Sequence, residues 1–409
     1  MAAVAPQSRV SLDIVVNGRN WATRVTGATT GVLFGHFPAR RAARLDLIAT
    51  LRHDQPAPAH RAAPHRGRGA NTAINTPFLQ ASPPRPPWNH ASTHQWGIWV
   101  FGLSRGSLLP GWIGCAPQGD HIAVVLVQPV AGGRPAIRWA EHTPWDQPTR
   151  ALQALRRSRA LHRHRRVALL QRSQYQCVAM DAPADVPRPD WAAAVRWQLK
   201  DTVDFAVDSA AIDVLAVPEG TSYRAQAQLI AVAAAADQVR PLVEQAIDAG
   251  TPWQAVDITE TALRNLSALV EPEGRAQALL HCQPHHATLV VTYGGELLSA
   301  RQMDLALLLP AEADDAVRIQ AFDQAGLELQ RTLDGIERAF GQVTLARLLI
   351  TPMPGAAALC EHLGPLLYVP VAPLQLDAVL DFSDVPELLA DASLLNRQLC
   401  AIGAALREA

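Results

Sequence analysis

The stretch that decides the fold is LLHCQPHHATLVVTYGGELLSAR, residues Leu279–Arg301. Its apolar residues fall into three short runs, of which the second covers Ala287–Thr292 and the third Glu296–Arg301. Gly294–Gly295 separates these two runs, and glycine readily takes the positive φ that a hairpin turn needs. The residues Cys282–His286 separate the first two runs. The stretch therefore predicts three short strands joined by two tight turns.

The composition is that of a chain with a large core. Its 409 residues suffice for about two to three domains, 49% of them are hydrophobic and the mean hydropathy is +0.03. No apolar run approaches the roughly 18 residues of a membrane span, and the N-terminus lacks the order of a signal peptide. The five cysteines are scattered without a CxxC pair, which is typical of reduced thiols. We therefore expect a cytoplasmic protein, and the net charge of −1 argues against a chain built as a whole for nucleic acid.

Residues 1–99 differ from the rest of the chain. Between Met1 and His90 there are eleven arginines against three acidic residues, and Gln55–Pro87 is rich in Pro, Arg, Ala and His. Such a composition cannot bury enough apolar surface to offset the entropy of ordering. It predicts a disordered basic extension. Two alternatives are a basic arm for lipid head groups or nucleic acid, and upstream sequence that is not translated, with Val100 as the first residue.

From Trp112 onward, strands in hairpins precede helices, and this order occurs twice. The helix signal is strongest over Ile319–Phe340, where apolar residues alternate spacings of three and four. The expected helices lie at 147–164, 189–203, 239–247, 259–270, 319–340, 355–362 and 392–408, and the expected strands at 112–115, 121–130, 134–141, 167–170, 175–180, 211–217, 229–234, 254–258, within 277–302, 345–351 and 366–371. Two such halves joined near Gly274 indicate a two-lobed α/β protein.

Several segments resemble one known family. They are RPDWAAAVRWQLKDTVDFAVDSAAIDVLAVPEG (188–220), LIAVAAAADQVRPLVEQAIDAG (229–250), VDITETALRNL (256–266), LELQRTLDGIERAF (327–340) and CAIGAALRE (400–408). In this order they are similar to the MshI/PilM family, and the resemblance covers about residues 101–409. The RWQLKD and DITETALRNL motifs are the most similar to the MshI branch, which serves biogenesis of the mannose-sensitive haemagglutinin (MSHA) pilus.

The resemblance implies a two-lobed actin-like ATPase fold, like FtsA and PilM, with a small subdomain inserted in the first lobe. It divides the chain into lobe 1 at 100–274, with the insert at about 185–222, lobe 2 at 275–395, and a C-terminal helix at 396–409 that returns to lobe 1. It further implies a cytoplasmic scaffold of a type IV pilus machine, held at the inner membrane by partners. These would be the cytoplasmic tail of a bitopic PilN- or MshJ-like protein and other pilus assembly proteins, without nucleic acid.

Nucleotide hydrolysis in this superfamily needs two phosphate loops with acidic residues and a glycine-rich adenosine loop. The corresponding segments here are GCAPQGD (114–120), HCQPHHAT (281–288) and TPMPGAA (351–357). The expected acids are missing from both hairpin loops, and the third segment keeps one glycine. We therefore expect no catalytic residues and no bound cofactor. ATP binding or hydrolysis as an assembly ATPase stays an alternative, as does a basic-surface module for membrane or nucleic acid.

Six residues are candidates for a vestigial nucleotide site: Gly119, Gln283, His286, Glu328, Arg331 and Gly355. A solvated helix face explains Glu328 and Arg331 equally well. The cluster His281-Cys282-x-x-His285-His286 has ligand types that suit zinc, but no nearby CxxC or HxxxH completes four ligands. We expect no metal, and a polar loop in the place of a phosphate loop.

Trp191 and Trp197 are candidates for partner binding. They lie on different faces of the helix expected at 189–203, beside the strand expected at 211–217. A groove between a helix and a strand edge suits an extended peptide, and exposed tryptophan is a frequent hot-spot residue. The alternative is that both side chains belong to the core.

Overall fold

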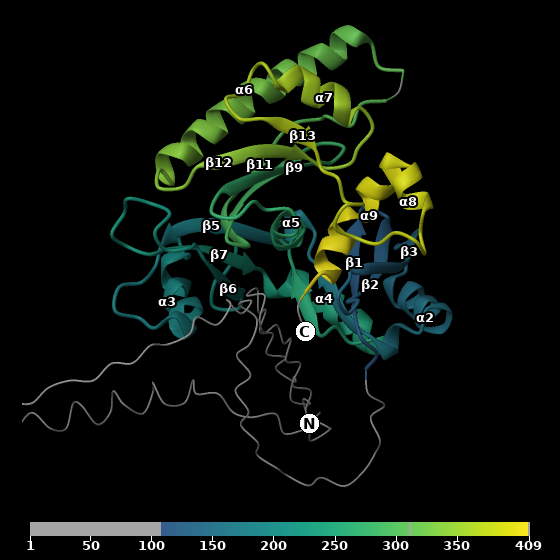
Figure 1. Cartoon of the computed structure of the whole chain (residues 1–409). Coiled ribbons are helices and arrows are strands. Elements are labelled where there is room, and N and C mark those ends of the chain that lie inside the picture. The colour runs from purple at the N-terminus through teal and green to yellow at the C-terminus, as the bar shows by residue number, and fades with distance from the viewer. Residues whose placement is uncertain (1–107, 311, 408–409) are drawn as a thin grey trace, which may run out of the picture. The chain divides into compact units, whose positions relative to one another are not determined.

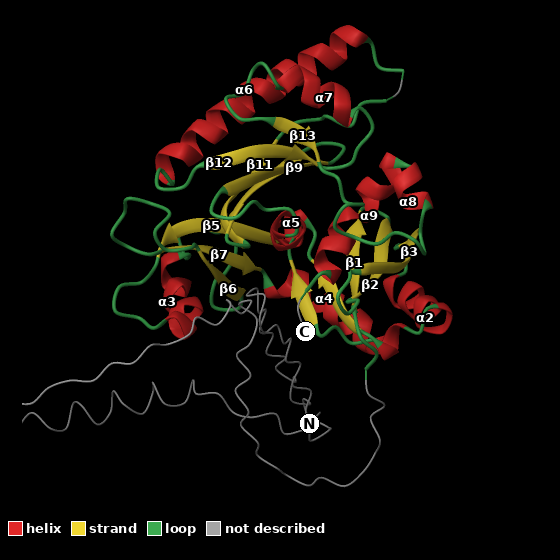
Figure 2. Ribbon diagram, viewed as in Figure 1, coloured by secondary structure: helices red, strands yellow, loops and turns green. Residues whose placement is uncertain are grey.

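The protein is described by a computed structural model that covers residues 108–310 and 312–407, so the extension expected at 1–99 lies outside the described residues. Two five-stranded sheets and one three-stranded sheet form the framework (Figure 2). The two large sheets have the same strand order, in which an antiparallel hairpin meander continues into parallel strands. Each large sheet is the core of one lobe.

Lobe 1 is built on the first sheet, in which β1 pairs with β2 antiparallel and with β4 parallel. The order across this sheet is β3 (Ala136–Pro144), β2 (His121–Gln128), β1 (Trp112–Gln118), β4 (Arg165–Leu169) and β8 (Ala255–Asp257). The β1–β2 turn is made by Gly119, whose φ of 62° is a conformation that glycine adopts at little cost. Leu170 and the carboxyl ends of β1 and β4 line the space between the lobes.

Lobe 2 contains Leu279–Arg301, and this stretch forms the three predicted strands. The order across its sheet is β11 (Glu296–Met303), β10 (Ala287–Tyr293), β9 (Ala276–Cys282), β12 (Leu345–Ile350) and β13 (Val371–Pro373). Gly294 and Gly295 both have positive φ in the β10–β11 turn, as predicted. Every residue of β9 is buried, because the strand lies in the middle of the sheet.

The third sheet is formed by the chain between β4 and α4 (Ala236–Asp248), a unit that we call the insert, and has the order β5 (Tyr175–Asp181), β7 (Gln228–Ala234) and β6 (Ala211–Ala216). One of its faces packs on α3 (Trp191–Gln198) in a small core of its own that includes Val195 and Leu199. The chain enters this unit after β4 and leaves it at β7. The sheet thus spans 175–234 and extends on both sides of the range 185–222 expected from the sequence.

The remaining helices are α2 (Pro148–Ser158), α4 (Ala236–Asp248), α5 (Thr259–Ala268), α6 (Asp315–Ala339), α7 (Ala356–Leu363), α8 (Glu387–Ala390) and α9 (Ala392–Ala405). No helix in the described part is long and apolar enough to cross a membrane. α2 is shorter than the helix expected at 147–164, because Ala160 takes a left-handed φ of 49° and turns the chain so that Leu161 is fully buried.

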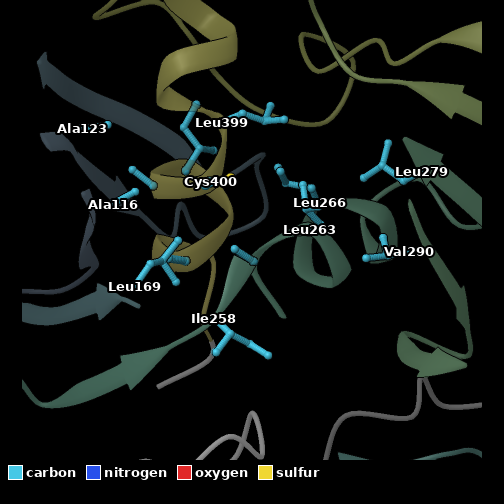
Figure 3. Packing of buried hydrophobic residues seen from close by; sticks show 14 of the residues in the cluster. Ala116, Ala123, Leu169, Ile258, Leu263, Leu266, Leu279, Val290, Leu399 and Cys400 are labelled. Atoms are coloured by element: carbon cyan, nitrogen blue, oxygen red, sulfur yellow. The ribbon is translucent and has the colours of Figure 1, made fainter. Parts of the chain in front are cut away.

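Helices α5 and α9 cross in close contact, which we call the α5–α9 seam. A Cβ atom on Gly403 of α9 would lie 2.2 Å from the carbonyl oxygen of Ala262 in α5. A Cβ on Gly114 of β1 would lie 2.0 Å from the carbonyl oxygen of Ala401. α9 therefore returns to lobe 1 and sits against both β1 and α5, with Leu399 and Cys400 among the buried side chains at this junction (Figure 3).

Candidate functional site: the cleft between the lobes

A cleft of about 740 Å³ lies where the two lobes face each other. Its walls are the β1–β2 turn, the segment after β4, the β9–β10 turn and the first half of α9. Three of these follow the carboxyl ends of strands, which is where α/β sheets commonly place ligands. We call this space the interlobe cleft. Its chemistry is set by two hairpin turns, one from each lobe.

The first turn carries an acid beside an imidazole. His121 Nδ1 lies 2.8 Å from the carboxylate of Asp120, and this hydrogen bond lowers the pKa of Asp120 below its ordinary value. The side chain of Asp120 is 87% exposed. Gln118 donates a 2.6 Å hydrogen bond to the carbonyl oxygen of Arg397 in α9, which holds the turn against that helix.

The second turn presents mainly side chains to the cleft. The backbone N–H of Gln283 is already used, since it donates to the carbonyl of His286 over 2.8 Å. Pro284 has no N–H to offer. The turn presents the side chains of Gln283, His285 and His286 to the cleft instead of a row of backbone donors.

Imidazoles are the commonest titratable groups in the cleft. The rings of His121 and His142 stack with centroids 4.8 Å apart. Burial lowers the pKa of His142, and the neighbouring charges of His121 and Arg397 lower it further. Burial also lowers the pKa of His286, with Arg172 as the second cause. The lowered pKa values favour the neutral forms of His142 and His286 at neutral pH.

His281 is the most buried of these groups and links the lobes. Its Nδ1 lies 3.2 Å from the hydroxyl of Thr351, and its Nε2 lies 3.5 Å from Cys400 Sγ of α9. Burial, followed by the charge of His286, lowers its pKa from 6.5 to about 4. His281 is thus a neutral hydrogen-bonding core residue rather than a cation.

Two buried carboxylates, Asp257 and Glu260, are close in sequence to the cleft-lining residue Thr259 and are already engaged. Arg407 Nη1 lies 2.6 Å from the Asp257 carboxylate, whose other oxygen accepts from Thr261 and from the backbone N–H of Ile258. The hydroxyl of Tyr175 donates to Glu260 over 2.6 Å. Among the described residues that line the cleft, Asp120 is therefore the one carboxylate, which is a poor set for ordering Mg²⁺.

The structure brings three of the six vestigial-site candidates together. Gly119, Gln283 and His286 line the cleft. Glu328 is half-buried and Arg331 exposed on α6, and Gly355 precedes α7 with a φ of 77°, all outside the cleft lining. Within residues 108–310 and 312–407, no group of three or more His, Cys, Asp or Glu side chains is placed to hold a metal ion.

Sequence reasoning missed several residues that shape the cleft: Asp120, His121, His142, Arg172 and Arg397. Asp120 and His121 directly follow Gly119, so the hairpin signal itself pointed to them. Nothing in the local sequence marks His142, which arrives from β3, or Arg397, which arrives from α9. Arg172 bridges the lobes by donating to Gln302 of β11, a contact between residues far apart in the chain.

The two candidate tryptophans of the insert have different environments. Trp191 is 5% exposed and donates its indole N–H to the carbonyl of Val186 over 3.0 Å. Trp197 is 71% exposed, which excludes the interpretation that both belong to the core. Trp191 also lines a groove of about 440 Å³ together with Val214 and Ala216 of β6.

Comparison with known proteins identifies the fold. No protein-family model and no curated protein matches the chain. Among solved structures, the chain is similar to one in the PilM–PilN type IV pilus biogenesis complex, with a TM-score of 0.55 and 19% identity over 73% of this chain and 98% of that one.

Two further structures are less similar to this chain. A protein of actin-like ATPase fold and unknown function from Bacteroides thetaiotaomicron VPI-5482 gives a TM-score of 0.40 and 11% identity over 69% of this chain and 96% of that one. The cytoplasmic domain of EpsL, an inner membrane component of the type II secretion system of Vibrio cholerae, gives 0.35 and 13% over 50% and 76%. The predicted two-lobed actin-like ATPase fold is confirmed.

Proposed function

We propose that this chain is a cytoplasmic scaffold of a type IV pilus machine of the MSHA kind, and that it does not hydrolyse ATP. It binds the cytoplasmic tail of a PilN- or MshJ-like bitopic protein, is held at the inner membrane by this contact, and meets other pilus assembly proteins there. The observation that carries the proposal is the match to nearly the whole chain of a PilM–PilN structure. The MSHA assignment rests on the RWQLKD and DITETALRNL motifs.

The chemistry of the interlobe cleft supports a role without hydrolysis. Phosphoryl transfer needs metal ions held by acids and donors aimed at the phosphates. Here Asp257 and Glu260 are committed to Arg407 and Tyr175, and Asp120 stands almost fully in solvent. The second turn offers imidazoles in place of backbone N–H groups. A scaffold keeps the two lobes for recognition and has no use for these catalytic parts.

The insert provides the binding surface in this proposal. β6 is an outer strand of its sheet, so one of its edges has no partner strand among the described residues and suits pairing with an extended peptide. The groove beside it is walled by Trp191, and α3 also presents Trp197 to solvent. The insert thus combines an outer strand with an exposed tryptophan on the helix that contacts this strand, and tryptophan is a frequent hot-spot residue.

Calorimetry tests both halves of the proposal. The full chain is titrated with a synthetic cytoplasmic-tail peptide of the PilN-like protein from the same organism, and separately with ATP–Mg²⁺. Trp197→Ala should weaken peptide binding by more than about tenfold, or 1.4 kcal/mol, and leave the melting temperature unchanged. Leu327→Ala, at a 57% exposed position of α6, is the control and should bind normally.

Three results would contradict the proposal. If the peptide does not bind, the proposed partner is wrong. If a folded Trp197→Ala variant binds the peptide normally, the binding groove does not include Trp197. Metal-dependent ATP turnover by the purified protein that Asp120→Asn abolishes would establish the alternative, an actin-like assembly ATPase.

A further inference from the structure

The outer edge of β11 is open. Within the described residues, β11 is the last strand of its sheet and pairs with β10 alone. A cavity of about 730 Å³ runs along it and touches four consecutive residues, Leu298–Arg301. Successive side chains of a strand point to opposite faces, so a cavity that meets four in a row follows the edge of the strand and not one face. We call this cavity the edge slot.

The edge slot has two further walls. One is a stripe along α6 that includes Arg331, Gly335 and Ile336. The other is the face of the inserted sheet that β5 and β7 present toward lobe 2, with Ala179 and Ile230 (Figure 1 shows this sheet below the sheet of lobe 2). A strand edge, a helix and a sheet face together form a channel with apolar sides, which suits a chain in extended conformation.

The charge of the edge slot is positive. Three arginines and one acid line it, and the acid, Asp181, lies 3.3 Å from Arg224 in an ion pair. Arg301 and Arg331 are exposed, and neither forms an ion pair within residues 108–310 and 312–407. The carboxylates of a bound segment could form ion pairs with these two guanidinium groups, because carboxylate and guanidinium have matching hydrogen-bonding geometry.

We propose that the edge slot binds an extended acidic segment of another protein, which adds a strand to β11 and places its carboxylates against Arg301 and Arg331. Alternate apolar side chains of the segment would lie against Ile336 and Ile230. The N-terminal extension of this chain does not fit, since its eleven arginines against three acids between Met1 and His90 would repel both guanidinium groups. The proposal goes beyond the scaffold function and does not rest on it.

Fluorescence polarisation with two short labelled peptides tests the proposal on the full chain. One peptide alternates glutamate and valine, and the other alternates lysine and valine. The acidic peptide should bind at least about tenfold more tightly, with an affinity that falls as salt is added, since both arginines are exposed. Arg331→Glu should weaken its binding at least about tenfold, while Arg338→Glu, on the same helix but outside the slot, should change it less than about twofold.

Gly335 supplies a steric test that is independent of charge. A Cβ at this position meets no atom within 4 Å, and the residue is exposed, so Gly335→Ala and Gly335→Leu should both fold. The leucine side chain fills the slot and should abolish binding of the acidic peptide, whereas alanine should preserve it. Melting curves of all variants confirm that the folds are intact.

Three results would overturn the proposal. The first is equal affinity for the acidic and basic peptides, and the second is binding that neither Arg331→Glu nor Gly335→Leu changes. The third is a wild-type dimer in sedimentation that Gly335→Leu converts to a monomer, because the slot would then join two copies of this chain instead of holding an acidic partner.

Discussion

The α5–α9 seam and the interlobe cleft are neighbours, but they differ in how much space surrounds their glycines. In the seam, one methyl group at Gly403 would fall 2.2 Å from a backbone oxygen that cannot move aside easily. In the cleft, a Cβ on Gly119 would meet no atom of the described residues within 4 Å, and a substitution there would be strained by the positive φ of 62° rather than by crowding. The seam is defined by backbone contact and the cleft by side chains. A chain can therefore exchange the chemistry of its cleft and keep its two-lobed fold.

The charged side chains of the two regions also differ, since a buried pair lies at the border of the seam and two exposed ones lie in the cleft. Asp257, which accepts from Thr261 of α5, pairs with Arg407 just beyond α9 at the border of the seam, and their side chains are only 3% and 5% exposed. Asp120 in the cleft is 87% exposed and Arg397 is also exposed. Removing one member of a buried pair leaves an uncompensated charge in a medium of low polarity, whereas water replaces the partner of an exposed charge. Stability should therefore depend on the seam, and ligand choice on the cleft.

The largest effect is expected from Arg407→Met. It leaves the Asp257 carboxylate buried without its guanidinium, which should lower the free energy of unfolding by about 3–5 kcal/mol. Arg397→Met is the matched change in the cleft and should cost less than about 0.5 kcal/mol. Urea unfolding followed by circular dichroism measures both, and equal losses for the two variants would refute the contrast between seam and cleft.

Gly403→Ala is expected to have the next largest effect. Its Cβ would overlap the carbonyl of Ala262, so the two helices must separate, at a cost of about 3 kcal/mol. Gly335→Ala is a matched control in helix α6, where nothing lies within 4 Å. It should be neutral or stabilise the fold by up to about 1 kcal/mol, because alanine is the better helix former. A Gly403→Ala variant as stable as wild type would show that the helices adjust without strain.

A smaller effect concerns pH and His281, which stands where the seam meets the cleft. Its pKa is about 4 when folded and 6.5 ordinarily, so the unfolded chain takes up a proton first as the pH falls. The stability gained by keeping this imidazole neutral is complete above pH 6.5 and is lost down to pH 4. The loss should reach roughly 2–3 kcal/mol.

Two variants isolate this effect of pH. His281→Gln removes the titrating group, so its unfolding free energy should fall less than that of wild type between pH 6.5 and 4. His162→Gln, at an exposed position, should follow the wild-type curve. The measurement is chemical denaturation at several pH values. Parallel curves for His281→Gln and wild type would mean that His281 is not buried as a neutral group.

The fold was predictable because its signals are local. The residues Leu279–Arg301 carry their strand pattern and turn glycines within one short segment, and the long α6 carries a sustained helical period. Element ends were less predictable, since tertiary contacts decide them. α2 stops early so that Leu161 can be buried, and the insert reaches back to Tyr175 because β5 pairs with β7 at the other end of the unit.

The candidate site was predictable only in part, because it assembles residues from distant segments. The lack of an acid in the second turn could be seen in the sequence, and Gly119, Gln283 and His286 do meet in the cleft. The ion pair between Asp257 and Arg407 could not be predicted, since 150 residues separate them. The helical period separates Trp191 from Trp197, but only packing shows which of the two is buried.

The smallest expected effect is that of nucleotide on stability, and it tests the cleft directly. A ligand that binds only the folded chain stabilises it by RT ln(1 + [L]/Kd). With ATP–Mg²⁺ at about 1 mM, a Kd of about 10 µM would add about 2.7 kcal/mol, whereas a Kd of about 1 mM would add about 0.4 kcal/mol. The turns of this cleft offer one exposed carboxylate, and the N–H of Gln283 is already bonded to the carbonyl of His286, which favours the weaker case. We therefore expect the melting temperature to rise by less than about 1–2 °C in differential scanning fluorimetry.

Asp120→Asn should leave that small shift unchanged, because the carboxylate interacts with His121 and solvent. A rise of several degrees that requires Mg²⁺ and disappears in Asp120→Asn would show that the cleft holds a metal–nucleotide complex, and that Asp120 helps to hold the metal.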